Sequence, residues 1–232
     1  MNSLYYGFGS TFEMLLLILG VIVVAFSQIK VKSAYSKYSG VKSSKKITGC
    51  EVARMILDKN GLDNVHVVEV KGELTDHYDP KQKVVRLSTN VFHGDSIASI
   101  SVAAHECGHA IQDKDNYVFM RIRASLVPVV NFVTKFGYIA TIIGFAFGMF
   151  NALICGIVML LATLLFQLIT LPVEFDASNR AKKIINDLNL VNPEEQEGVS
   201  SMLSAAAFTY VASVINTLLN LLRLVMRYND RD

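Results

Sequence analysis

An apolar run over residues 136–173 constrains this chain more than any other feature of its sequence. It is too long for one membrane-spanning helix of about 20 residues, and its length suits two spans joined by a tight turn near residues 148–152. The composition agrees, since 52% of the 232 residues are hydrophobic, only 18% are charged, and there is no Trp. Ordinary soluble domains are less apolar than this. We therefore expect an α-helical integral membrane protein.

Four segments are apolar enough to be considered as membrane spans. They are residues 12–29, 127 to about 150, 153–173 and, more weakly, 205–226. The last segment carries a polar stripe that we expect to pack against other helices. This stripe comprises Thr209, Ser213, Asn216 and Asn220. If the segment crossed, Arg223, Arg227 and Arg231 would lie outside the cell, against the positive-inside rule. The charges therefore favour a segment that lies along the cytoplasmic face or re-enters, and whether it crosses stays open.

The charges around the first span predict its orientation. The flank before it has no Lys or Arg and contains Glu13, which favours a retained anchor over a cleaved signal peptide. Six Lys follow within 17 residues, and the positive-inside rule places them in the cytoplasm. They are Lys30, Lys32, Lys37, Lys42, Lys45 and Lys46. We therefore expect a multi-pass protein of the cell membrane with residues 30–125 in the cytoplasm.

The remaining composition excludes two classes of function. The net charge is only +2, and no basic stretch is interleaved with exposed aromatic residues, so a nucleic-acid partner is not expected. Cys50, Cys107 and Cys155 lie in separate segments without a CxxC pair, which argues against a redox centre. Cys107 is expected to pack in the core.

Residues 30–125 have the pattern of a small α+β domain. Thr48 and Glu51 form a capping box before a helix that should end at Asn60-Gly61. Two β-branched runs follow, over residues 65–70 and 83–87, with turn residues Asp79-Pro80 between them. The strand immediately before the next helix would be useful to a peptidase if its edge were free to pair with an extended peptide, and the sequence leaves that point open.

The next helix, predicted over residues 96–112 with Asp95 or Ser96 as N-cap, carries the sequence His105-Glu106-Cys107-Gly108-His109. Two His four residues apart project from one face of a helix, so both imidazoles can bind one Zn²⁺. A carboxylate beside them can take a proton from the zinc-bound water and pass it to a leaving amine. The motif therefore predicts a zinc hydrolase with Glu106 as its general base.

Zinc in a catalytic site needs a third protein ligand. The candidates are His77, His93, Asp113, Glu174 and Asp176. Glu174 is favoured because it follows the third span in a helical-looking stretch. Two spans separate it from His109, and an even number returns the chain to the same face of the membrane.

The chain resembles the YugP-type membrane zinc metallopeptidases. The resemblance rests on residues 75–80 (TDHYDP), 102–112 (VAAHECGHAIQ) and 172–178 (PVEFDAS), and it covers nearly the whole chain. More remotely, the chain is similar to the HtpX and CAAX prenyl protease group. These resemblances imply a zincin-like, gluzincin-type catalytic domain, with His105, His109 and Glu174 as zinc ligands and Glu106 as the catalytic residue.

One position departs from the wider group. Four residues after the ligand Glu that group has an Asp, whereas this chain has Ser178. The hydrogen bonds that orient the ligands are therefore expected to be built differently, with Asp176 or Arg180 involved.

The expected organisation has five parts. They are an anchor (1–29), a cytoplasmic zincin-like domain (30–125), a transmembrane hairpin (126–173), a cytoplasmic segment with the third ligand (174–204) and a fourth hydrophobic helix with the tail (205–232). The expected function is endopeptidase cleavage at the cytoplasmic face, with His77, Tyr78 or Tyr210 holding the oxyanion and a peptide or protein, including membrane proteins, as substrate. The alternative is a noncatalytic membrane scaffold or chaperone that keeps a structural zinc site. The sequence leaves the oligomeric state open.

Overall fold

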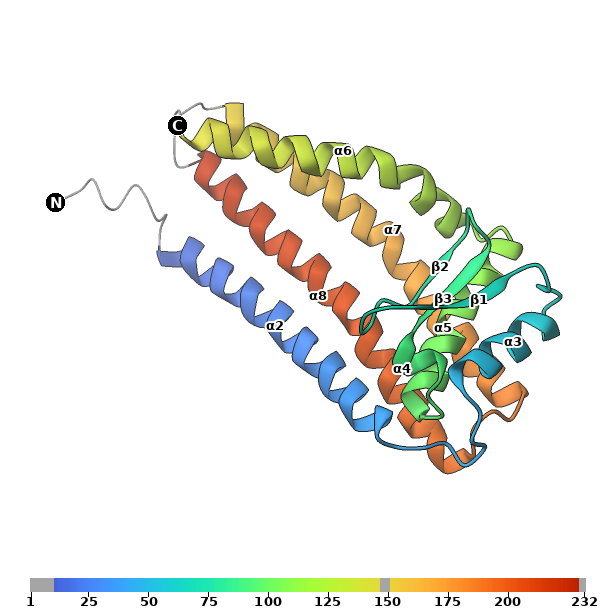
Figure 1. The fold of residues 1–232 in the computed structure, drawn as a ribbon. Coiled ribbons are helices and arrows are strands. Elements are labelled where there is room, and N and C mark those ends of the chain that lie inside the picture. The colour runs from blue at the N-terminus through green and yellow to red at the C-terminus, as the bar shows by residue number, and fades with distance from the viewer. Residues whose placement is uncertain (1–10, 147–150, 230–232) are drawn as a thin grey trace. The chain divides into compact units, whose positions relative to one another are not determined.

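The computed structural model describes residues 11–146 and 151–229, and this part of the chain is mostly helical (Figure 1). The helices are α2 (Thr11–Ser39), α3 (Gly49–Lys59), α4 (Thr89–Phe92), α5 (Ile97–Lys114), α6 (Val118–Ala146), α7 (Asn151–Asp187), the 3₁₀ turn η1 (Pro193–Glu195) and α8 (Gln196–Asn229). The strands are β1 (His66–Val70), β2 (His77–Asp79) and β3 (Val84–Ser88).

The chain divides into two compact units. The first, called here the apolar unit, comprises Met1–Gln28, Ile122–Leu171 and Thr209–Asp232. The second, called here the sheet unit, comprises Ile29–Arg121 and Pro172–Phe208. Each unit therefore combines segments that are far apart in the sequence, and the long helices α2, α7 and α8 contribute residues to both.

The sheet has the order β1-β3-β2. β3 pairs in parallel with β1, where Val67 is opposite Val85, and antiparallel with β2, where Tyr78 is opposite Val85. The strand immediately before the motif helix is therefore the central strand, so both of its edges are paired and neither is free for a peptide. The edge strands are β1 and β2. β2 is the strand that the sequence did not predict, because its three residues are too few to show an alternating pattern.

The core of the sheet unit lies between α3, β3 and α5. Ile56 on α3, Leu87 on β3 and Ile100 on α5 are fully buried, and burying each such side chain contributes about 1.5–3 kcal/mol. The predicted capping box holds the start of α3, where the Glu51 amide donates to Thr48 Oγ1 and the Thr48 amide donates to Glu51 Oε2. α3 ends where Gly61 adopts a φ of +63°.

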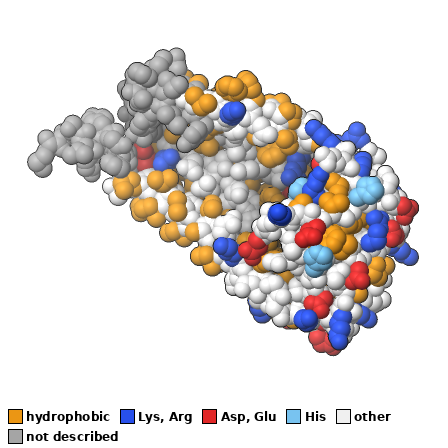
Figure 2. Space-filling model, viewed as in Figure 1, with side chains coloured by type: hydrophobic (Ala, Val, Ile, Leu, Met, Phe, Trp, Pro, Cys, Tyr) orange, Lys and Arg blue, Asp and Glu red, His pale blue; other side chains and the backbone are white. Residues whose placement is uncertain are grey.

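Within residues 11–146 and 151–229, three helices are long and apolar enough to cross a membrane, namely α2, α7 and α8. Figure 2 shows hydrophobic side chains along α2, whereas Lys, Arg, Asp, Glu and His gather around the sheet and α3. In the apolar unit, Gly20 of α2 faces the side chain of Asn216 on α8, so this member of the polar stripe packs against another helix, as expected.

The predicted second span corresponds to α6, although residues 147–150 lie outside the described part of the chain. Within that part, Val118–Gly137 is long and apolar enough to cross a membrane only when it is taken together with α5. The axes of these two segments differ by 94°. The predicted third span corresponds to α7, which continues as a helix through Pro172 to Asp187.

Candidate metal centre

Helix α5 presents the two His of the motif. The Ser96 side chain accepts from the Ser99 amide at the N-terminus, so the helix begins where the sequence predicts, and it ends two residues later than predicted, at Lys114. The rings of His105 and His109 meet edge to face with their centroids 4.8 Å apart. Both rings lie against the interior, since the His109 residue is 8% exposed and the His105 side chain 16%.

Helix α7 brings Glu174 to the same place. Glu174 is 2% exposed. Its Oε2 lies 3.4 Å from His105 Nε2 and 3.6 Å from His109 Nε2. The close approach of the two helices depends on Gly108, because a Cβ on this residue would lie 2.7 Å from the carbonyl oxygen of Ala177. A side chain at position 108 would therefore hold α7 away from α5.

The donor set fits a zinc ion. One ligand atom from each of His105, His109 and Glu174 lies within 4.8 Å of the other two. Ligand atoms that each lie about 2.0–2.1 Å from a tetrahedral zinc are about 3.4 Å apart, which is close to the two distances given above. Two imidazoles and a carboxylate are a common catalytic zinc set that leaves a fourth position open. The residues present therefore fit zinc in both chemistry and spacing.

Both imidazoles have a hydrogen-bond partner at Nδ1, the ring nitrogen that does not face Glu174. His109 Nδ1 lies 2.9 Å from Oε1 of Gln112, whose Nε2 donates to Val173 O and to Asp176 Oδ2, both at 2.8 Å. His105 Nδ1 lies 3.3 Å from Ser178 Oγ. Ser178 therefore contacts a ligand directly, and Asp176 acts on the other ligand through Gln112.

Glu106 is buried beside this set. Burial raises the pKa of its carboxyl group above the ordinary value, and the nearby His105 and His109 oppose that shift. The charges of Glu174 and Asp76 raise the pKa further. A carboxylate with a raised pKa holds a proton more readily near neutral pH, which suits a group that must accept a proton and release it.

The other predicted ligands lie elsewhere. Asp113 accepts from Tyr78 Oη at 2.7 Å and from Lys83, and His93 bonds to Glu69. Asp176 faces Gln112 and Arg180. His77 is exposed and bonds to a backbone carbonyl. Among the described residues, only His105, His109 and Glu174 converge as a group that could hold a metal.

Two predicted oxyanion donors are also placed. The Tyr78 hydroxyl is engaged by Asp113, and burial together with that hydrogen bond raises its pKa. His77 bonds through Nδ1 to Thr75 O. Tyr210 belongs to the apolar unit.

Sequence reasoning missed the roles of Gly108 and Gln112. Both lie in the motif helix, and the spacing of three residues from His109 to Gln112 puts their side chains on neighbouring positions of one helix face. That spacing is the only signal in the sequence. Cys107 was assigned correctly, since it is fully buried and its thiol faces Ala53 O of α3 at 3.6 Å.

Comparisons with known proteins agree with this geometry. The chain is 49% identical over 208 residues to the "Putative membrane protease YugP" of Bacillus subtilis (strain 168), a match that covers 89% of this chain and 92% of that protein. No solved structure matches the chain. A family model described as "Putative neutral zinc metallopeptidase" matches residues 13–229. The chain therefore belongs to this family of neutral zinc metallopeptidases.

Proposed function

We propose that this protein is a zinc-dependent endopeptidase of the cell membrane that hydrolyses peptide bonds with Glu106 as its general base. The observation that carries the proposal is the convergence of His105, His109 and Glu174 beside a buried carboxylate that is not itself part of the ligand set. A structural zinc site needs no general base next to its ligands, so this arrangement favours an enzyme over a scaffold.

The side chains divide the work as follows. His105, His109 and Glu174 would hold the ion. When bound, zinc supplies a Lewis acid that polarises the scissile carbonyl and lowers the pKa of a bound water to about 7. Glu106 takes the proton of the attacking water at a carboxylate oxygen. It then passes that proton to the leaving amine nitrogen.

The surrounding fold supports a zincin-like, gluzincin-type domain. Helix α3, the mixed sheet and α5 precede a later helix that carries the acidic ligand. Strand β2 is an edge of the sheet and contacts α5, so its outer side is the place where an extended substrate backbone would add a strand. Main-chain pairing of this kind requires no particular side chain in the substrate. The substrate class proposed is therefore a peptide or an extended protein segment.

The cytoplasmic face is the proposed location of the site. The six Lys after residue 29 favour the cytoplasm, and the passage of the chain through the hairpin of α6 and α7 would return Glu174 to that side. The candidate spans and the similarity to a membrane protease support a membrane location. The partners expected are therefore the lipid bilayer and proteins accessible from the cytoplasm.

The test compares wild type with Glu106→Gln in detergent. Both proteins should hold about one zinc per chain, because the substitution leaves His105, His109 and Glu174 in place. Cleavage of a peptide library should fall by about 10²- to 10⁴-fold in Glu106→Gln. Glu69→Gln, which changes an exposed Glu on β1, is the matched control and should cleave like wild type.

Two results would count against the proposal. Equal cleavage by wild type and Glu106→Gln would remove Glu106 from the reaction. Zinc-loaded wild type that cleaves no peptide would favour the scaffold.

A further inference from the structure

Gln112 is a buried polar residue that the proposed mechanism does not use. It lies one turn after His109 on α5 and has 0% exposure. A buried amide without hydrogen-bond partners is strongly destabilising, so the partners of Gln112 are informative. Its Oε1 lies 2.9 Å from His109 Nδ1, and its Nε2 lies 2.8 Å from both Val173 O and Asp176 Oδ2.

The chemistry of the partners fixes the orientation of this amide. A backbone carbonyl and a carboxylate can only accept hydrogen bonds, so the group facing Val173 and Asp176 must be the NH₂ of Gln112. The carbonyl Oε1 must then face His109. Because Oε1 can only accept, His109 must carry its proton on Nδ1.

This assignment leaves Nε2 of His109 as the nitrogen with the free lone pair. That nitrogen is the one that faces Glu174 Oε2, at 3.6 Å. Gln112 therefore holds His109 in the tautomer and the ring orientation that a metal requires. His105 is less constrained, because Ser178 Oγ, at 3.3 Å from its Nδ1, can either donate or accept.

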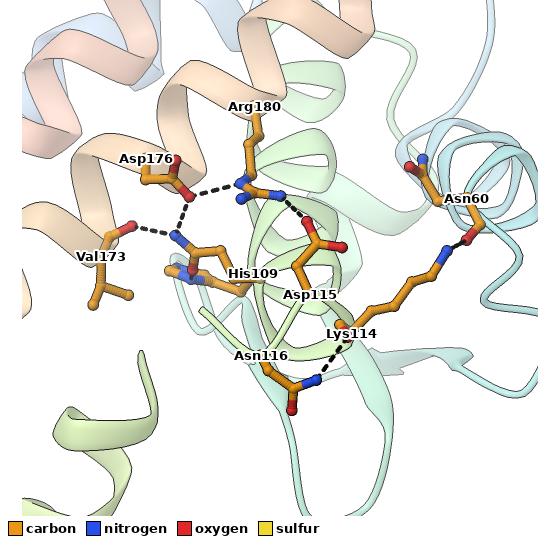
Figure 3. A network of polar contacts seen from close by, with 9 residues as sticks. Asn60, His109, Lys114, Asp115, Asn116, Val173, Asp176 and Arg180 are labelled. Atoms are coloured by element: carbon orange, nitrogen blue, oxygen red, sulfur yellow. Dashed lines mark hydrogen bonds and ion pairs between the residues drawn. The ribbon is translucent and has the colours of Figure 1, made fainter. Parts of the chain in front are cut away.

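Asp176 is in turn held in place by charge. Arg180 donates through Nε to Asp176 at 2.6 Å and through a terminal nitrogen to Asp115 at 2.5 Å (Figure 3). Asp115 is the C-cap residue of α5, so the Arg180–Asp115 ion pair joins α7 to α5, whereas the Arg180–Asp176 ion pair lies within α7. The result is a continuous chain of contacts from Asp115 to His109.

We propose that Gln112 and Asp176 are positioning residues that set the metal affinity of the site by fixing the Nδ1–H tautomer of His109. The inference rests on the proposed function, since it takes His109 as a ligand. Residues that orient a metal-binding His typically change metal affinity by about 10- to 100-fold. Here the orienting group is an amide whose direction is set by a carboxylate on another helix.

The experiment measures zinc affinity by competition with a chelator, using the purified full chain in detergent. Gln112→Met keeps the size of the side chain but removes the acceptor for His109, and zinc should bind about 10- to 100-fold more weakly. Ser101→Ala removes another buried hydrogen bond of α5, from Oγ to Ile97 O, and is the matched control with unchanged affinity. Thermal unfolding without metal establishes that each variant is folded.

A charge exchange separates positioning from a general structural role. Gln112→Glu keeps an acceptor for His109 but sets a carboxylate against Asp176, so zinc affinity should fall. Adding Asp176→Asn supplies an amide donor opposite the new carboxylate and should recover much of the loss, a coupling that a double-mutant cycle detects. If Gln112 served only to stabilise the fold, the losses of zinc affinity caused by Gln112→Glu and Asp176→Asn would add in the double variant.

The outcomes also distinguish this inference from the proposed function. If wild type binds zinc and Gln112→Met binds it equally well, the positioning role is wrong while the peptidase proposal stands. Additive losses in the charge exchange would overturn the positioning role as well. If wild type itself binds no zinc, the proposed function fails and the inference fails with it. The absorption spectrum of Co²⁺-loaded protein gives a second measurement, since a reoriented His109 changes the ligand geometry.

Discussion

The close contact between α5 and α7 at Gly108 makes a sharp prediction. In Gly108→Ala the new Cβ would lie 2.7 Å from Ala177 O and 3.2 Å from Ala177 Cα, both of which are backbone atoms. Carbon–carbon contacts are optimal at about 3.5–4.0 Å, so the helices must separate by roughly half an ångström or more. Ala177 lies three residues after Glu174, so this displacement moves a ligand.

The size of the effect follows from the cost of overpacking. Inserting a methyl group into a well-packed contact costs about 1–3 kcal/mol. If α7 moves away from α5 to relieve the strain, metal binding must bring the two helices together again. The free energy of zinc binding is then less favourable by the cost of overpacking. At about 1.4 kcal/mol for each tenfold change, zinc should bind roughly 5- to 140-fold more weakly.

Chelator competition on the purified protein measures this change. Gly137→Ala is the control, because its new Cβ would lie 3.1 Å from Met159 Cβ and both residues belong to the apolar unit. Zinc affinity in Gly137→Ala should equal that of wild type. Zinc binding by Gly108→Ala within about twofold of wild type would refute the idea that close packing of α5 and α7 builds the site.

The remaining predictions concern the third ligand and the sidedness of the membrane. Glu174→Ala should lose zinc, since three protein ligands are the usual catalytic set, whereas Asp113→Ala should keep it; metal analysis showing the reverse would move the third ligand. In a background without native Cys, Lys45→Cys and Lys183→Cys should resist an impermeant thiol reagent in intact cells, and Asn151→Cys should react. Labelling of only one of the two Lys positions from outside would contradict a site shared across the hairpin.

The sequence predicted the two central helices of the sheet unit well, because their ends are marked by local signals. Thr48 and Glu51 form the capping box that their spacing indicates, and Ser96 caps α5 with its side chain. Such signals act over three or four residues and survive any arrangement of the rest of the chain. The approach of Glu174 to the motif helix agrees with the prediction from the sequence, which rested on two expected spans between His109 and Glu174.

The arrangement of the sheet was not predictable. β1 and β3 were recognised by their β-branched residues, but β3 lies between β1 and β2 and pairs with both. β2 is formed by His77–Asp79, of which the sequence pattern assigned only Asp79, with Pro80, to a turn. The extended conformation of β2 depends on its pairing with β3. Arg86 of β3 also donates a hydrogen bond to the Asp79 side chain, at 3.0 Å. Propensity within a short window carries no information about such pairing.

The roles of Gly108 and Gln112 depend on a helix that is distant in sequence. Gln112 contacts Val173, 61 residues away, and Asp176, 64 residues away. The sequence of α5 alone shows Gly108 only as a poor helix former and Gln112 only as a polar residue near the end of a helix. The sequence therefore identified the atoms that would bind the metal, while the contacts that arrange those atoms required the structure.

The length of α7 bears on where the proposed peptidase meets its substrates. The helix has 37 residues and is about 55 Å long, whereas the hydrocarbon core needs only about 20 residues. Counted from Asn151, that length ends near Leu171, and the sheet unit resumes at Pro172. In the proposed membrane topology, Glu174 would lie within one turn of the bilayer boundary. Because an extended backbone cannot satisfy its polar groups in hydrocarbon, we expect the peptide bonds that reach Glu106 to come from loops or segments at the membrane surface rather than from within a span.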